Sequence, residues 1–234
     1  MSGFASILEG SATWSAGCSI PRHRHARAYA AVILSGGYEE SGSFGRYRVR
    51  SGQVLLHRAF DAHLDRFEPS GAQILNLLLD EEPGFGWGSV ADPDAIARVA
   101  EKDAGSAVAA LNEQLEPLEP RPSDWPDFLA RDLLENPQLR LGEWAERYGL
   151  APATLSRGFA MVFATSPAAF RAEVRAQSAL ALIAGGIHSL AEIAAVAGFA
   201  DQSHMTRAVG ALTGSPPGQW RRSNRFKTPP DTSP

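Results

Sequence analysis

The sequence predicts an α+β protein of two domains, a sheet-rich N-terminal domain with a few helices and an all-α C-terminal domain. Three observations lead to this prediction. Short apolar runs separated by glycine fill residues 10–80, helical periodicity replaces them after residue 90, and residues 116–126 hold four prolines in eleven positions. With 234 residues, 44% of them hydrophobic, the chain can bury two modest cores.

The first 88 residues are expected to form the sheet domain. Val, Ile and Tyr lie between Gly-Gly and Ser-Gly turns over residues 10–80, which is typical of antiparallel strands. In "GRYRVRSG" (45–52), arginines alternate with Tyr47 and Val49, so this strand should bury one face only.

Residues 89–116 are expected to form two helices, the first beginning at Pro93 behind Asp92. Both carry an apolar stripe, made of Ile96, Val99 and Ala100 in the first and of Val108, Leu111 and Leu115 in the second. These stripes indicate a buttress packed on the sheet or, alternatively, dimerisation helices that form a subunit interface.

The proline-rich stretch 117–126 is predicted to be a linker, because proline interrupts a helix. Residues 127–225 then have a helical pattern throughout. Helices are expected at 127–135, 141–149, 152–164, 167–184, 190–197, 201–212 and 216–223. Residues 226–234 are expected to be a disordered tail.

One supersecondary unit occurs twice in the helical region, at 141–164 and at 190–212. The sequence repeats Leu141, Glu143, Ala145 and Gly149 as Leu190, Glu192, Ala194 and Gly198, and repeats Leu155 and Arg157 as Met205 and Arg207. Each copy has a short helix, a glycine suited to a left-handed turn and a second helix, which is the helix-turn-helix pattern. A capping box of Ser189 and Glu192 should fix the start of the later copy.

The second helix of each unit is predicted to contact DNA. Met205, Ala208 and Val209 should face the core, which leaves short polar side chains exposed beside them. Gln can pair with adenine, and Arg with guanine or a phosphate. The predicted DNA-binding residues are Ala153, Ser156, Arg157, Gln202, Ser203, Thr206 and Arg207. The alternative is a pair of helical hairpins with solvated polar faces, which the repetition disfavours.

Residues 125–223 resemble the DNA-binding domain of AraC-type (AraC/XylS) transcriptional regulators, most specifically through "SLAEIAAVAGFADQSHMTRAVGALTGSPPGQWR" (189–221). The resemblance implies two helix-turn-helix units joined by a long helix, binding to promoter DNA, and activation or repression under the control of an effector. The sequence departs from the family pattern at four positions. Met205 and Val209 replace aromatic residues, Thr165 replaces a glycine, and Ala151 replaces a serine cap.

Three histidines of the sheet domain form a candidate ligand site. His23 and His25 should project to the same side of a strand, and a second strand could return His63 to the same cavity. Three imidazoles would suit Zn, Fe, Mn, Ni or Cu. Alternatively, these side chains bind an anionic ligand or form hydrogen bonds without a metal. The remaining histidines are predicted to be surface, packing or DNA-facing residues: His57, His188 and His204.

The spacing of Gly17, His23, His25 and Gly36 resembles the first motif of cupin barrels, and Gly52 with His63 resembles the second. Tyr29 stands where the motif has its glutamate ligand. The resemblance implies a cupin-like β-barrel with the effector-binding residues His23, His25, Tyr29 and His63, and with His23, His25 and His63 as metal ligands. The missing carboxylate argues against an enzymatic cupin.

Charge and composition limit the range of possible functions further. Residues 1–120 hold 10 Lys and Arg against 16 Asp and Glu, whereas residues 121–234 hold 12 against 10. The rear half is therefore only mildly basic, too little to establish a phosphate-binding surface by itself. A single cysteine, Cys18, excludes an internal disulfide, and no signal peptide or membrane-spanning run is evident, so a cytoplasmic location is expected.

We therefore expect a non-enzymatic, effector-binding transcription regulator whose partners are double-stranded DNA and a small molecule or metal. A contact with RNA polymerase and a homodimer are left open, and no membrane association is expected. The competing hypothesis is a metal-dependent cupin enzyme, an isomerase or dioxygenase, with a helical appendage.

Overall fold

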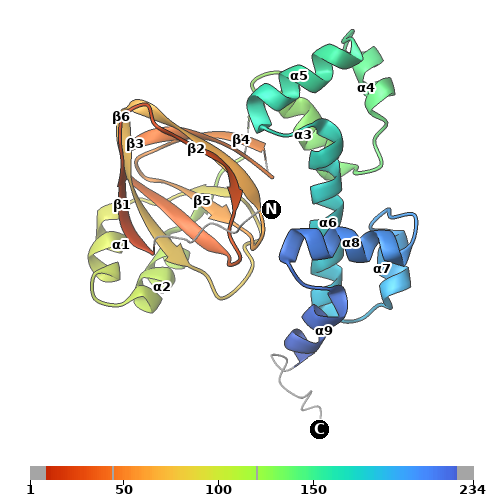
Figure 1. Cartoon of the computed structure of the whole chain (residues 1–234). Helices are drawn as coiled ribbons and strands as arrows, with labels where there is room; N and C mark the ends of the chain where they lie inside the picture. The colour runs from red at the N-terminus through yellow and green to blue at the C-terminus, as the bar shows by residue number, and fades with distance from the viewer. Residues whose placement is uncertain (1–8, 44, 120, 226–234) are drawn as a thin grey trace. The chain divides into compact units, whose positions relative to one another are not determined.

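The computed structural model describes residues 9–43, 45–119 and 121–225, with side chains as far as Arg221. The described chain is α+β, with its strands before residue 118 and helices throughout the rest, as the sequence predicts (Figure 1). It divides into two compact units, Met1–Arg131 with Leu155–Thr165, and Asp132–Thr154 with Ser166–Pro234.

The first unit contains an antiparallel sheet of eight strands, which curls on itself and is called the rolled sheet below. Its order is β1-β6-β3-β5-β7-β8, with β2 paired to β6 and β4 paired to β3. The strands are β1 (Gly10–Trp14), β2 (Ser19–Arg24), β3 (Tyr29–Gly42), β4 (Gly45–Arg50), β5 (Gln53–His57), β6 (Ala62–Leu78), β7 (Trp87–Ser89) and β8 (Glu116–Pro117). The first six strands lie within residues 10–80, where the glycine-punctuated pattern predicts antiparallel strands, whereas the two short strands β7 and β8 have no clear sequence signal.

The long strands β3 and β6 pair along most of their length and hold the sheet together. Their register shifts on both sides of Gly36, which has a φ of 70°. A Cβ atom at Gly36 would lie 2.0 Å from the carbonyl oxygen of Gly71. Glycine is therefore required at this bend, where two backbones approach closely.

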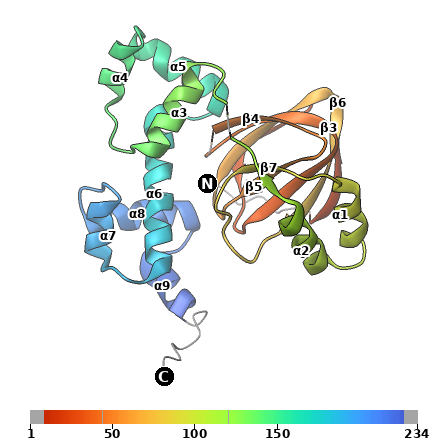
Figure 2. The ribbon, with the colours of Figure 1, turned by 180° about the vertical axis from the view of Figure 1, so that it is seen from behind.

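The rolled sheet has a hydrophobic core on each face. Tyr29, Ile33, Leu55 and Phe67 belong to one cluster of buried side chains. A second cluster joins sheet residues to α1 (Pro93–Ala100) and α2 (Ala104–Gln114), which lie side by side against the sheet (Figure 2). Because Ile96 and Leu111 are fully buried in this cluster, the apolar stripes of the two helices pack on the sheet.

The remaining helices are α3 (Trp125–Glu135), α4 (Leu141–Arg147), α5 (Pro152–Phe163), α6 (Pro167–Gly185), α7 (Leu190–Val196), α8 (Gln202–Thr213) and α9 (Pro217–Arg225). Their ends agree with the predicted ends to within two residues. In the second unit, α7, α8 and α9 gather around the C-terminal part of α6. Ile183 of α6, Ile193 of α7, and Met205 and Val209 of α8 belong to their common core.

The predicted disordered tail at 226–234 lies outside the described residues, and so do residues 1–8 of the predicted sheet domain. In the part that is described, no helix combines the length and the apolar character needed to span a bilayer.

Candidate functional site

The two predicted helix-turn-helix units have the same turn geometry. The backbone N–H of Leu150 donates to the carbonyl of Ala145, and 49 residues later the N–H of Phe199 donates to the carbonyl of Ala194, both at 2.8 Å. The glycines preceding Leu150 and Phe199 have φ angles of 64° and 76°. Because this left-handed conformation favours glycine, the sequence repeat is also a repeat of backbone conformation.

The helices of the later unit have well-defined starts. Ser189 and Glu192 form the predicted capping box, with Ser189 Oγ accepting from Glu192 N at 3.2 Å and Ser189 N donating to Glu192 Oε2 at 2.7 Å. Asp201 caps α8 by accepting from His204 N at 2.7 Å. In the earlier unit, the N-cap of α4 is Arg140, which makes no side-chain capping bond. The later unit is therefore the better-defined of the two.

The loop before α4 packs against the turn of the later helix-turn-helix unit, the turn that contains Gly198. Arg175 donates to the carbonyl of Pro137 and to the side chain of Gln138, and Arg171 donates to the carbonyl of Leu139. Gln138 lies so close to Gly198 that a Cβ atom there would overlap its amide nitrogen. Gly198 is thus needed both for its φ angle and for this close approach.

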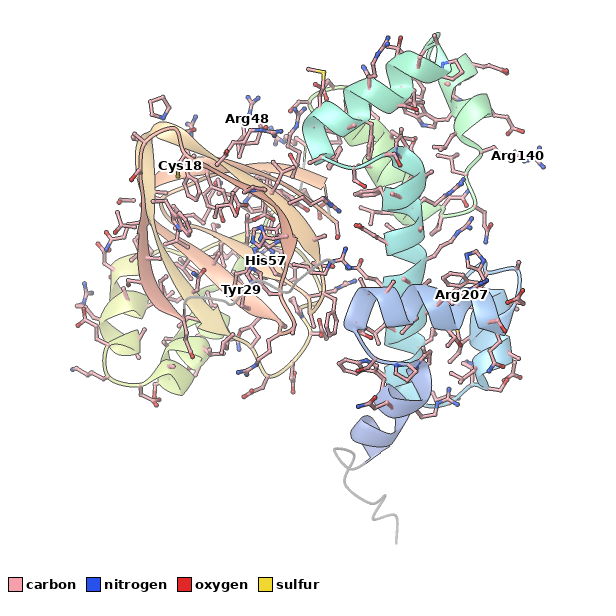
Figure 3. All side chains as sticks on the ribbon, viewed as in Figure 1. Cys18, Tyr29, Arg48, His57, Arg140 and Arg207 are labelled. Carbon is pink, nitrogen blue, oxygen red and sulfur yellow. The ribbon has the colours of Figure 1, made fainter. Side chains whose placement is uncertain are left out.

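Helix α8 divides its apolar and polar residues between two faces. Met205 and Val209 are fully buried, whereas Gln202, Ser203 and Arg207 are exposed and Thr206 is half-buried. Figure 3 labels Arg207 on this helix (Figure 3). The polar side chains that were predicted to bind DNA therefore lie on the exposed face of a helix whose other face is packed in the core.

Helix α5 has the same division with fewer polar groups. Leu155 and Phe159 are buried, and the predicted residues Ala153, Ser156 and Arg157 are exposed. Since Ser156 and Arg157 are the only hydrogen-bonding side chains among these three, α5 offers fewer contacts to base edges than α8.

The rolled sheet brings the four predicted ligand residues together. His23 of β2 pairs directly with His63 of β6, and their ring centroids lie 4.3 Å apart. The His25 ring lies 4.9 Å from His23 and 5.1 Å from Tyr29, and the Tyr29 hydroxyl is 3.2 Å from His63 Nε2. These four residues line a cavity of about 330 Å³.

Of the three roles predicted for His57, surface, packing or DNA-facing, the structure supports packing, and it places His57 in the same cluster as the predicted ligand residues. Its ring stacks on Tyr29 at 4.3 Å, and its Nε2 atom lies 3.5 Å from a carboxyl oxygen of Glu40. His57 ends β5 and pairs with Tyr29 at the start of β3. His188 and His204 are exposed, as predicted.

Two carboxyl groups of this site, Glu40 and Asp65, were missed by sequence reasoning. They pair across β3 and β6, form a hydrogen bond to each other and line the cavity. Glu40 is the second glutamate of "GGYEESG", and Asp65 lies in "AHLDRF", so neither has a distinctive sequence context. Only the pairing of the strands shows that they face the histidines.

Burial controls the protonation of the cluster. It raises the pKa of the Asp65 carboxyl to about 7, and burial together with the charges of Asp65 and Asp61 raises the pKa of Glu40 well above its usual range. Burial, reinforced by the neighbouring histidines, lowers the pKa of His57 to about 3 and that of His63 well below its usual range. These imidazoles are neutral near pH 7, the form that binds metal ions.

The chemistry of the donor groups therefore fits a divalent metal. His23, His25 and His63 each offer a nitrogen within 4.8 Å of the other two, and three histidines can hold Zn²⁺ with a further position open. The same groups also suit a small uncharged ligand with hydrogen-bonding atoms, since aromatic and aliphatic side chains such as Trp14, Phe67 and Ile74 line the rest of the cavity.

A family model described as "Helix-turn-helix domain" matches residues 144–223, which include most of both units. This match agrees with the repeated turns. Residues 144–223 form a helix-turn-helix domain. A search of curated proteins gives no significant match.

Several solved structures match this chain at low identity. The C-terminal domain of AraT, a response regulator from Geobacillus stearothermophilus, is 21% identical, with 49% of this chain and 95% of that chain covered and a TM-score of 0.43. A probable AraC family transcriptional regulator from Rhodopseudomonas palustris is 20% identical over 41% and 93%, with a TM-score of 0.39. ToxT from Vibrio cholerae is 10% identical over 91% and 97%, with a TM-score of 0.41.

The departures from the AraC-type pattern are accommodated by the structure. Met205 and Val209, which replace aromatic residues, are fully buried in the core of the second unit. Ala151, which replaces the serine cap, directly precedes α5. An alanine offers no side-chain oxygen to the first backbone N–H groups of that helix.

Proposed function

We propose that this chain is an AraC-type transcription regulator, that it recognises promoter DNA through both helix-turn-helix units, and that it is controlled by a ligand bound in its cupin-like rolled sheet. The observation that carries the proposal is the exposed polar face of α8, set on a fully buried apolar row. A side chain placed in this way can reach the edges of bases in the major groove.

The proposed contacts differ between the two units. Gln202 and Arg207 are suited to adenine and guanine, with Ser203 and Thr206 bonding either base edges or phosphates. Ala153, Ser156 and Arg157 of α5 would contribute mainly to positioning. We infer that the two second helices enter successive segments of the major groove, about 34 Å apart.

The ligand is proposed to bind His23, His25, Tyr29 and His63, either as a small molecule or as a metal ion held by the three histidines. It would control DNA binding only if it prefers one arrangement of the protein over another. In this proposal the rolled sheet senses its ligand and does not catalyse a reaction, and the protein acts in the cytoplasm. A homodimer and a contact with RNA polymerase would add to promoter binding without being required for it.

A randomised-DNA selection with the full-length protein tests the proposal. We expect one enriched sequence with two conserved segments about one helical turn apart. The Gln202→Ala, Arg207→Ala double variant should lose the conserved bases of one segment and keep those of the other. Enrichment of no sequence, or the same sequence for both proteins, would contradict the proposal. Repeating the selected binding reaction with and without a chelator then tests control by a metal.

A further inference from the structure

A second group of metal-binding side chains lies in the rolled sheet beside the three histidines. Glu40 of β3, His57 of β5 and His63 of β6 each offer a ligand atom within 4.8 Å of the others, and all three residues are buried. We infer that these residues bind a divalent transition-metal ion. The inference rests on the proposed role of the rolled sheet as the ligand-binding part, and it adds a carboxylate to the site.

The distances suit coordination. His57 Nε2 lies 3.5 Å from Glu40 Oε2, and the rings of His57 and His63 have centroids 4.6 Å apart. Two ligands bound tetrahedrally to one ion at its usual bond lengths lie about 3.3–3.6 Å from each other. His57 and Glu40 therefore already have the required spacing.

Two imidazole nitrogens in this group need a partner. Among the described residues, neither His57 Nε2 nor His63 Nδ1 has a hydrogen-bond partner, although both atoms are buried. Buried polar atoms are normally satisfied, so two unpaired nitrogens at one place are available to bind a ligand. Tyr29 supports the arrangement by stacking on His57 and by contacting His63 Nε2 through its hydroxyl.

The charge of the surroundings favours a cation. Glu40, Asp65 and Asp61 are all buried, and the first two form a hydrogen bond to each other. Arg22 is the only Lys or Arg side chain among the residues that line the cavity. A divalent ion would favour the ionised form of these carboxyl groups and displace their protons, whereas an anion would be repelled by them.

Glu40 can supply the carboxylate ligand that the cupin motif places at position 29, where this chain has a tyrosine. Two imidazoles and one carboxylate form a common ligand set for Zn²⁺ and Fe²⁺. Here the carboxylate would come from the far end of β3, eleven residues after Tyr29. Gly42 permits this approach, since a Cβ atom there would lie 3.0 Å from the Cβ atom of His63.

Titration of Zn²⁺ into chelator-treated full-length protein, followed by calorimetry, tests the inference. Glu40→Gln and His57→Asn should each weaken binding at this position at least about tenfold. His23→Asn should retain it, because His23 belongs only to the three-histidine group. His188→Asn, which removes an exposed imidazole, should bind as the wild type does.

Wild-type affinity in both Glu40→Gln and His57→Asn, or no binding of Zn²⁺ to the wild type, would overturn the inference. X-ray absorption of the Zn²⁺-loaded wild type gives a measurement that needs no variant. It should show two imidazoles and at least one carboxylate oxygen for an ion at this position, and three imidazoles alone would overturn it. Gel shifts on the same preparations separate the two proposals, because failure of DNA binding would leave the metal result intact.

Discussion

In the rolled sheet, His57, His63 and Glu40 are buried together, whereas in α8 the side chains of Gln202 and Arg207 are exposed above a buried apolar row. Burying a polar group costs free energy unless it forms a hydrogen bond or coordinates an ion, so these buried groups are suited to an ion or a small molecule. An exposed row of donors and acceptors is solvated at little cost and is suited to a large polar surface such as DNA. The difference separates the proposed ligand-binding site from the proposed DNA-recognition surface.

The buried carboxyl Asp65 offers the largest effect with which to test the sheet side of this comparison. Its pKa is about 7 in the folded chain against 3.8 ordinarily, so its contribution to stability is complete below about pH 4 and is lost as the pH rises through about 7. In metal-free protein, Asp65→Asn should therefore become more stable relative to the wild type across this range, by a change on the order of 2–4 kcal/mol.

Hydrogen exchange of the β6 amides measures this stability locally. The stability of the variant is compared with that of the wild type at each pH, because other groups also titrate. His57, whose pKa is lowered to about 3, stabilises the folded protein as the pH rises, which is the opposite of the effect of Asp65. Asp80→Asn, which alters a fully exposed carboxylate, is the matched control. A difference between Asp65→Asn and wild type that is constant with pH would show that Asp65 is not held protonated by burial.

The arginines of the two units test the recognition side. Arg207→Ala should lower specific affinity by about 1–3 kcal/mol and relax the preference for one base pair, because a bidentate contact to guanine would be lost. Arg157→Ala should weaken binding to all sequences similarly and reduce the salt dependence, as expected for a phosphate contact.

Competition gel shifts on the selected site and its single-base variants, at several salt concentrations, distinguish these outcomes. Arg98→Ala is the control, since this exposed arginine lies on α1, in the buttress of the rolled sheet. An unchanged sequence profile for Arg207→Ala would remove Arg207 from the residues that recognise bases.

The helical part could be predicted from sequence almost completely, because its signals are local. Gly149 and Gly198 mark turns, Ser189 and Glu192 mark a helix start, and period 3.6 marks the faces, all within a few residues of the structure they determine. The 49-residue repeat then identified the units without any knowledge of tertiary contacts.

The histidine cluster could be predicted only in part, because its geometry depends on strand pairing. His23 and His25 are neighbours in sequence, and a motif spacing led to His63. His57, Glu40 and Asp65 reach the same place through the register of β3 with β5 and β6, which no local pattern encodes. The short strands β7 and β8 escaped prediction for the same reason.

The helix caps give the smallest effects and compare the two units directly. Ser189→Ala removes one half of the capping box, so the free energy of unfolding of the later unit should fall by about 1 kcal/mol. Ala151→Ser adds an oxygen before α5, so the earlier unit should gain up to about 1 kcal/mol. Hydrogen exchange of the α5 and α7 amides, measured in both variants, assigns each change to its own unit. A different outcome is that Ser189→Ala destabilises the later helix-turn-helix unit while Ala151→Ser leaves the stability of the earlier one unchanged. In that case the backbone before α5 does not present the serine hydroxyl to the first turn of the helix. The weaker definition of the earlier helix-turn-helix unit would then be explained by α4, whose start at Arg140 has no side-chain cap.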